Sequence, residues 1–129
     1  MASRLNVVDS SAWLAWFANE PAAGSFAEVI EDTEGLIVPS ICIAEVFKVI
    51  ARQRGEGDAL QAIAFMSQGS VVDLDAELAV AAAVTGLANK LPLADSIVYA
   101  TAQASDATLW TQDEDFEGMA GVRFIRKRK

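Results

Sequence analysis

Short apolar runs alternate along the chain with longer segments in which apolar residues recur every three or four positions. The short runs predict five strands, at residues 5–8, 36–38, 70–74, 108–111 and 122–125. The longer segments predict helices at about 11–17, 21–30, 40–54, 58–68 and 76–89, and from residue 92 past residue 99. Strands that alternate with helices in this way predict an α/β fold, a doubly wound, mainly parallel sheet of about five strands with helices on both faces.

Several predicted helices begin with residues that suit a helix start. Ser10 or Ser11 can cap the first helix, Ser40 the third and Asp75 the fifth, because short polar side chains accept hydrogen bonds from the first-turn N–H groups. Pro21 is placed to open the second helix.

The composition fits one compact domain over residues 1–129. Hydrophobic residues make up 53% of the chain and the mean hydropathy is +0.28, which excludes a disordered chain. Charged residues interrupt each apolar stretch well before the roughly 18 residues that a membrane helix needs. The N-terminus also lacks the long apolar segment of a secretory signal, so we expect a cytoplasmic protein with no membrane partner.

The chain contains no histidine and a single cysteine, Cys42. Without histidine it cannot form a Ser-His-Asp triad, a Cys-His pair or a His-ligated zinc site. Cys42 lies in an apolar run and is predicted to be a buried structural thiol. Any catalysis must therefore depend on carboxylates, and carboxylate-rich sites suit Mg²⁺, Mn²⁺ or Ca²⁺.

Four places along the chain put acidic residues in apolar surroundings: Asp9, Glu45, Asp95, and Asp113 with Asp115. Because ionised carboxylates are costly to bury unless they are paired, hydrogen-bonded or bound to a cation, these acids indicate one shared metal-binding pocket. Asp9 and Asp113 each follow a predicted strand, and ligands of open α/β sheets bind at the carboxyl ends of strands.

Each acid also has a purely structural explanation when it is taken alone. Glu45 can pair with Lys48 one turn later, Asp95 can favour the dipole at a helix N-terminus, and residues 113–117 can form a solvent-exposed acidic loop. It is the combination of the four places that favours the metal pocket.

The net charge of −8 argues against extensive contact with phosphates, although five of the ten basic residues lie in the last seven positions. They are Arg123, Arg126, Lys127, Arg128 and Lys129. Residues 126–129 form a basic tail, for which a solubilising role is the simpler interpretation and contact with nucleic acid is the alternative.

Four segments together resemble the PIN-domain ribonucleases, and specifically the VapC-type toxins of toxin–antitoxin pairs. They are VVDSSAWLA at 7–15, PSICIAEVFKVIAR at 39–52, LPLADSIVYATA at 91–102 and TQDEDF at 111–116. Their order, spacing and placement match over nearly the whole chain. Trp13 and Trp16 stand where this family more often has aliphatic residues, and core packing or a dimer contact is favoured over base stacking for them.

The resemblance implies a set of site residues. The residues expected to carry catalysis are Asp9, Glu45, Asp95 and Asp113. Those expected to hold the metal are Asp9, Asp95, Asp113 and Asp115. Two small hydroxyl residues, Ser10 and Thr111, match positions that support these acids.

The resemblance further implies an endoribonuclease that depends on Mg²⁺, or on Mn²⁺ in its place, and uses metal-activated water to cleave an RNA phosphodiester. Glu45 would orient or deprotonate this water, since no histidine is available. The expected partners are the RNA substrate, a cognate antitoxin protein that occupies the active-site groove, and a second copy of the chain in a homodimer. Toxin and antitoxin would form a hetero-oligomer.

Three other functions stay open on the sequence. A PIN nuclease of RNA processing would act without an antitoxin, and a catalytically inactive PIN module would only bind protein. A phospho-receiver domain is also a small acidic α/β fold. It would need an aspartate at the end of its third strand and a lysine at the end of its fifth, where Asp73 and Arg123 fit poorly.

Overall fold

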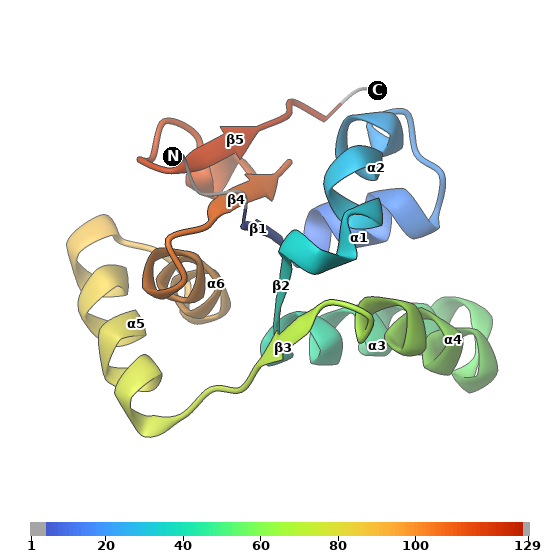
Figure 1. The fold of residues 1–129 in the computed structure, drawn as a ribbon, viewed down its shortest axis with the longest axis horizontal. Helices are drawn as coiled ribbons and strands as arrows, with labels where there is room; N and C mark the ends of the chain where they lie inside the picture. The colour runs from blue at the N-terminus through green and yellow to red at the C-terminus, as the bar shows by residue number, and fades with distance from the viewer. Residues whose placement is uncertain (1–4, 128–129) are drawn as a thin grey trace.

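Five parallel strands form the sheet of the computed structural model, which describes residues 5–127 (Figure 1). They are β1 (Asn6–Val8), β2 (Leu36–Pro39), β3 (Ser70–Val72), β4 (Thr108–Thr111) and β5 (Val122–Phe124). All five predicted strands are confirmed, with small differences at their ends. The strands lie in the order β3-β2-β1-β4-β5, and every neighbouring pair is parallel.

The direction in which the chain builds the sheet reverses at β1. This strand pairs with β2, where Val7 lies opposite Ile37, and with β4, where Val7 lies opposite Leu109. The chain leaves β1 toward one edge of the sheet and leaves β4 toward the other. Such a reversal leaves a crevice at the carboxyl ends of the two central strands, which is where ligands bind in open α/β sheets.

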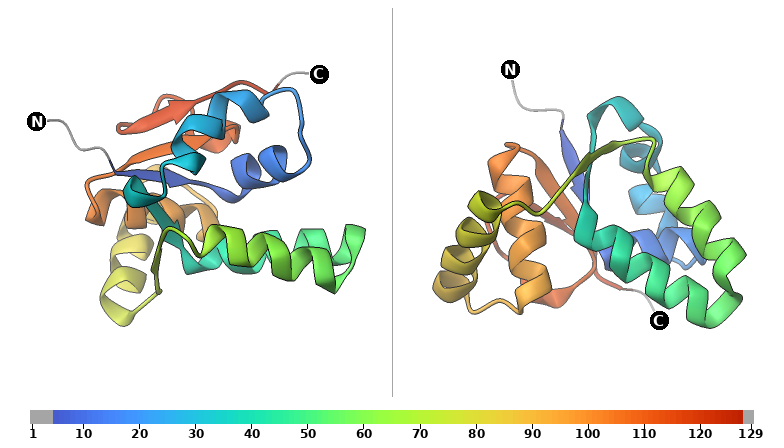
Figure 2. Two further views of the ribbon diagram at one scale, coloured as in Figure 1. Left: turned by 45° about the vertical axis from the view of Figure 1, so that its right-hand side comes forward. Right: turned by 90° about the horizontal axis from the view of Figure 1, so that it is seen from below.

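Six α-helices cover the two faces of the sheet within the described residues (Figures 1 and 2). They are α1 (Ser10–Phe17), α2 (Ala23–Glu31), α3 (Ser40–Arg54), α4 (Glu56–Met66), α5 (Ala76–Asn89) and α6 (Leu93–Ala104). Helices α1 to α4 lie on one side and α5 and α6 on the other, while α3 packs along α4 and α5 along α6. Two short 3-10 turns are η1 (Thr33–Gly35) and η2 (Glu114–Phe116). A helix long and apolar enough to cross a membrane is not found between residues 5 and 127.

The N-cap of α1 differs from the prediction. Asp9, and neither Ser10 nor Ser11, holds the cap position: its backbone is extended and its Oδ1 accepts a hydrogen bond from the Ala12 N–H at 3.1 Å. Aspartate caps helices as well as serine does, so the cap falls on the residue at which β1 gives way to the helix. The Asp9 carboxylate therefore caps α1 and also lies at the edge of the sheet where β1 ends.

The other predicted helix starts are close to those observed. Asp75 caps α5 as predicted and accepts a hydrogen bond from a first-turn N–H at 2.8 Å. Ser40 is the first residue of α3, and Pro39 holds its N-cap position. Pro21 lies in a turn, and α2 begins at Ala23. The local capping chemistry thus places these helix starts to within a few residues.

The aromatic residues of α1 belong to the core. Trp13 has no exposed surface and stacks on Phe17, with 5.7 Å between the ring centroids. The half-buried Trp16 lies against Phe65 of α4, with 4.8 Å between centroids. This packing confirms the core interpretation of Trp13 and leaves it no surface for stacking on a base. Cys42 is also buried, as predicted.

Candidate active site

Asp9 is buried at the end of β1, with only 4% of its surface exposed. Its Oδ1 accepts hydrogen bonds from Ser11 Oγ at 2.7 Å and from the Ala12 N–H at 3.1 Å. Its Oδ2 accepts one from Thr111 Oγ1 at 2.7 Å. Hydrogen bonds to a charged acceptor are strong, so three of them in a buried setting hold this carboxylate in one orientation.

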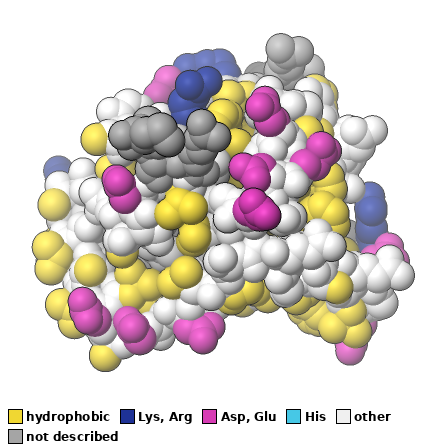
Figure 3. Space-filling view, in the orientation of Figure 1, with side chains coloured by type: hydrophobic (Ala, Val, Ile, Leu, Met, Phe, Trp, Pro, Cys, Tyr) yellow, Lys and Arg dark blue, Asp and Glu magenta, His cyan; other side chains and the backbone are white. Residues whose placement is uncertain are grey.

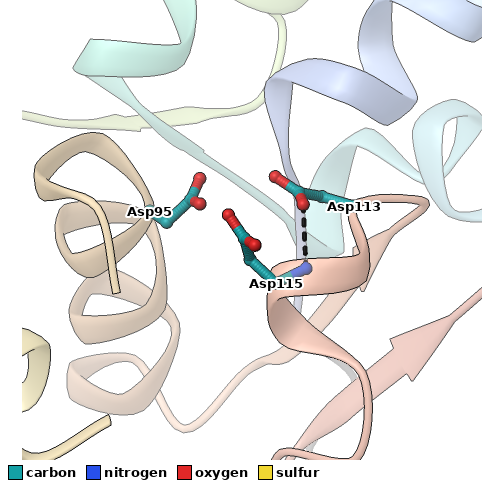
Figure 4. A group of neighbouring side chains, drawn as sticks. All are labelled: Asp95, Asp113 and Asp115. Carbon is teal, nitrogen blue, oxygen red and sulfur yellow. Dashed lines mark hydrogen bonds between the residues drawn. The ribbon is translucent and has the colours of Figure 1, made fainter. Parts of the chain in front are cut away.

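Asp95, Asp113 and Asp115 form a second feature, a group of carboxylates that point toward one another (Figure 4). One oxygen from each side chain lies within 4.8 Å of the other two. Asp95 lies in the first turn of α6, and Asp113 caps η2 by accepting a hydrogen bond from the Asp115 N–H at 2.9 Å. The fold therefore brings together predicted acids from two elements that are separate in sequence.

The environment of these acids raises two pKa values. Burial raises the pKa of Asp9 to about 6 despite the hydrogen bonds it accepts, and the charge of Asp113 adds to the increase. For Asp95, burial, a hydrogen bond with Asp115 and the charges of Asp113, Asp115 and Asp9 together raise the pKa to about 7. These interactions place Asp9 electrostatically beside the group of three.

Glu45 lies on α3, outside the group of three. Its Oε1 accepts a hydrogen bond from Ser10 Oγ at 2.5 Å, which ties it to the residue next to Asp9. Among residues 5–127 it has no ion pair with Lys48, so the pairing explanation does not apply. Burial raises the pKa of the Cys42 thiol above its usual range, and the charges of Asp9 and Glu45 add to this. Both carboxylates therefore lie near the same buried thiol.

The donor set suits a hard divalent cation. The candidate ligand atoms are carboxylate oxygens, which Mg²⁺ and Mn²⁺ prefer, and Mg²⁺ is commonly held by a few carboxylates with water in its remaining positions. In addition to burial, neighbouring negative charges raise the pKa of Asp95, and a bound cation would offset that repulsion. Asp95, Asp113 and Asp115 have the geometry to hold such an ion, with Asp9 beside them.

A comparison with protein families decides which family this site and fold belong to. The family model of the PIN domain matches residues 7–122. The chain belongs to the PIN domain family. A comparison of this chain with curated proteins found no match.

Solved structures share the fold of this PIN domain. A toxin–antitoxin complex from Klebsiella pneumoniae contains a chain that is 22% identical, with a TM-score of 0.80 over 95% of this chain and 99% of that one. DNA-bound VapBC from Salmonella typhimurium gives 18% identity and a TM-score of 0.70 over 95% and 97%. VapC20 from Mycobacterium tuberculosis, described as a sarcin-ricin loop cleaving toxin, gives 18% identity and a TM-score of 0.69 over 96% and 99%. At these identities the likeness shows a common fold.

The strand order of the PIN domain also argues against a receiver domain. Receiver-like sheets place the third strand next to the first, in the order 2-1-3-4-5. Here β3 is an edge strand that pairs only with β2, and the exposed Asp73 that follows it is separated from Asp9 by the width of β2. These two aspartates cannot form the shared acidic site that a receiver needs.

The hydroxyl residues predicted to support the PIN site lie in contact with its acids. Ser10 donates to Glu45, and Thr111 donates to Asp9 while its Oγ1 accepts a hydrogen bond from the Asp113 N–H at 2.9 Å. Thr111 thus joins the ends of β1 and β4. Its single hydroxyl fixes Asp9 and the backbone of Asp113 relative to each other.

Two residues of the PIN site were missed by reasoning from the sequence. Ser11 donates to Asp9, and the largely buried Gln112 donates from Nε2 to the Ser11 carbonyl at 3.3 Å, which links α1 to the segment that leads into Asp113. The available signal for Ser11 was its position two residues after an aspartate, where a hydroxyl can bond back to the carboxylate. No sequence pattern marks Gln112.

A cleft of about 290 Å³ opens beside the acidic site. Ser11 and Gln112 form part of its wall on the side of the site, and α3 contributes Arg54. Lys127, from the basic tail, also lines it. The cleft therefore has two basic side chains in a wall that also includes Ser11, the hydrogen-bond donor to Asp9.

The basic tail is divided between two environments. Arg126 pairs with Glu117 at 2.9 Å between Nη2 and Oε2, so its charge is partly offset on the surface. Lys127 instead faces the cleft, whereas Arg128 and Lys129 lie outside the described residues. The solubilising role favoured for the tail stays a prediction, with contact to nucleic acid as the alternative.

Proposed function

We propose that this PIN domain is a divalent-metal-dependent endoribonuclease and the toxin of a VapC-type toxin–antitoxin pair. The observation that carries the proposal is the approach of Asp95, Asp113 and Asp115 to within 4.8 Å of one another, beside the buried Asp9. The similar solved structures support it, since they include toxin–antitoxin complexes and a sarcin-ricin loop cleaving toxin. We also propose that the protein works in the cytoplasm.

The acids would divide the work of the reaction. Asp95, Asp113 and Asp115 would hold Mg²⁺ or Mn²⁺, and Asp9 would contribute directly or through water. When bound, the ion supplies electrostatic stabilisation at the phosphate and lowers the pKa of water. Glu45 would orient the attacking water or accept its proton, because Ser10 holds its carboxylate in place and the chain has no histidine.

The RNA backbone would lie along the cleft beside the site. A protein with a net charge of −8 needs local positive charge to approach RNA, and Arg54 and Lys127 supply it in the cleft whose wall includes Ser11, the donor to Asp9. Phosphate contacts of this kind position the substrate without selecting its sequence.

A cognate antitoxin would control the enzyme by placing an arginine among the acids. A guanidinium donates paired hydrogen bonds to carboxylates, and its positive charge favours the ionised form of acids whose pKa is raised by their neighbours. The complete assembly that we propose is a toxin homodimer bound by antitoxin. Expression of the chain should then arrest growth, and the product of an adjacent short reading frame should relieve the arrest. Cleavage without growth arrest or an inhibitor would instead favour a nuclease of RNA processing.

RNA cleavage with and without Mg²⁺ tests the enzymatic proposal. Asp9→Asn and Asp95→Asn preserve side-chain size but remove the charge, and both should abolish Mg²⁺-dependent cleavage while the protein stays folded. Asp106→Asn is the matched control, because Asp106 lies between the C-terminal end of α6 and the start of β4, whereas the acids lie at the N-terminal end of α6 and beyond the end of β4. Asp106 is also exposed and has a φ of 52°, a conformation that asparagine adopts readily. Undiminished cleavage by both site variants would refute the proposed site.

A further inference from the structure

Basic side chains gather at the edge strand β5, which pairs only with β4. All 18 acids of the chain precede residue 123, but only five of its ten bases do. Of the remaining bases, the structure describes Arg123 within β5, and Arg126 and Lys127 shortly after it. Figure 3 shows Lys and Arg side chains over β5. This edge therefore concentrates positive charge on an otherwise acidic molecule.

Two of these arginines lie over aromatic rings. Arg123 Cζ is 5.1 Å from the ring centroid of Trp110, and Arg126 Cζ is 5.5 Å from that of Phe124. The Trp110 ring is held in place, since its Nε1 donates a hydrogen bond to Asn6 Oδ1 at 2.8 Å. Contact with a ring restricts an exposed guanidinium and leaves its N–H donors available to a ligand.

Both arginines keep a charge that a ligand can use. Both are exposed, and among residues 5–127 Arg123 has no ion pair. Arg126 pairs with Glu117 at 2.9 Å and lies 3.9 Å from Glu114. These three side chains are 48–78% exposed, and ion pairs between exposed side chains contribute little free energy. A phosphate can therefore take the place of either carboxylate.

The register of β5 brings these arginines toward the acids of the site. Phe124 lies opposite Thr111, the residue whose hydroxyl bonds Asp9. Because β4 and β5 are parallel, both strands end at the same edge of the sheet. Arg126 then contacts the first residue of η2, the short turn that also contains Asp115. The basic residues and the candidate metal ligands therefore meet at η2.

We propose that the β5 surface, defined as Arg123 and Arg126 with the rings of Trp110 and Phe124, binds phosphates of single-stranded RNA next to the phosphate that is cleaved. The inference rests on the proposed function and deepens it by adding a contact outside the cleft. The β5 surface and the cleft are joined along the chain, because Arg126 is followed by Lys127, which lines the cleft.

A purely structural role is the simpler explanation for a charged edge strand. Arginine on an edge opposes pairing with another chain, and a solubilising role accounts for basic residues at 126–129. Neither role requires guanidinium groups over rings or a contact with η2. Phosphate binding also accounts for the charge distribution, since the acids elsewhere repel RNA and the basic edge attracts it.

Fluorescence anisotropy of a labelled single-stranded oligouridine, titrated in Mg²⁺ at several salt concentrations, tests the β5 surface. The full chain carries Asp9→Asn, so that the probe is bound without being cut. Arg123→Gln and Arg126→Gln, each added to this variant, should lower the affinity about 3- to 10-fold. Each should also reduce the salt dependence by about 0.7 units of slope, the value for one phosphate contact with a single strand.

Arg52→Gln is the matched control. It removes the same charge from an exposed position on α3, which follows β2 on the other side of β1 from β5, and the slope should stay unchanged. Arg123→Lys and Arg126→Lys keep the charge, so they should keep the slope while losing part of the affinity. This result would show that the glutamine variants act through charge and not through a damaged fold.

Four results would overturn the β5 surface: no binding of the probe, unchanged slopes in both glutamine variants, an equal loss in Arg52→Gln, or a loss confined to antitoxin binding. The last would assign the surface to a partner protein. Unchanged slopes in a chain whose wild type cleaves RNA would leave the proposed function in place. A wild type that binds the probe through Arg123 and Arg126 but cleaves no RNA would refute the proposed nuclease and support the surface.

Discussion

Replacing Asp9 by asparagine should stabilise the metal-free protein at neutral pH. The buried carboxylate has a pKa of about 6, compared with an ordinary value of 3.8. Keeping it ionised in the folded state is therefore unfavourable, and the gap between the two values corresponds to about 3 kcal/mol of unfolding free energy. Asparagine removes this contribution because it carries no charge.

The direction of this effect and its pH range depend on whether the folded or the unfolded protein binds the Asp9 proton more tightly. The folded protein binds it more tightly, because burial raises the pKa of Asp9. The ionised carboxylate therefore destabilises the folded protein fully above a pH of about 6, and this destabilisation disappears as the pH falls through 3.8. At pH 4.5 about 1 kcal/mol of it remains. Asparagine keeps an acceptor for Ser11 and Ala12 but offers none to the Thr111 hydroxyl, which costs about 1 kcal/mol. The variant should therefore be about 2 kcal/mol more stable than the wild type at pH 7.5 and about equal to it at pH 4.5.

Urea unfolding followed by circular dichroism, in the presence of a chelator at the two pH values, measures this difference. Other acids titrate in both proteins, so the comparison isolates Asp9 and its effect on its neighbours. Added Mg²⁺ should stabilise the wild type more than the variant, since an ion that binds the folded state raises its stability. If Asp9→Asn were destabilising by the same amount at both pH values, the buried carboxylate would be ionised without cost, and the electrostatic reasoning would be wrong.

Three further predictions concern individual contacts of the site and cleft. Thr111→Val removes the hydroxyl that bonds both Asp9 and the Asp113 N–H, and it should weaken Mg²⁺ binding, measured by calorimetry, by about 10- to 100-fold. Unchanged affinity would show that this hydroxyl does not position the ligands. Glu45→Gln should leave Mg²⁺ affinity intact and lower the single-turnover cleavage rate by roughly 100-fold, whereas lost Mg²⁺ binding would make Glu45 a ligand. Arg54→Ala should reduce the salt dependence of RNA binding by about one unit of slope, measured with a non-cleavable RNA, and an unchanged slope would mean that RNA does not reach the cleft.

The fold was largely predictable because its signals are local. Short apolar runs and apolar residues that recur every three or four positions can be recognised among neighbouring residues, so the strands and helices could be assigned without tertiary information. The outer face of α5 was not predictable in the same way. Its sequence is rich in alanine and has apolar residues on all sides, so the pattern does not distinguish the side that meets α6 from the side that meets solvent.

The candidate site was predictable as a set of acids and less so as an arrangement. Apolar neighbours pointed to the burial of Asp9, which the structure confirms. Sequence alone could not show that Glu45 lies outside the group formed by Asp95, Asp113 and Asp115, because its position depends on the distances between α3, α6 and η2. Nor could it choose Asp9 over Ser10 or Ser11 as the cap of α1, since all three residues are good caps and the choice depends on where β1 ends.

The hydrogen bond from Thr111 to Asp9 joins residues 102 positions apart, and this separation has a consequence for synthesis. Asp9 leaves the ribosome 102 residues before Thr111, and Asp113 and Asp115 follow Thr111. An incomplete chain therefore has the first acid without the partners that orient it or the group beside it. In the endoribonuclease proposed above, this order would postpone activity until the segment that contains Thr111, Asp113 and Asp115 has been made.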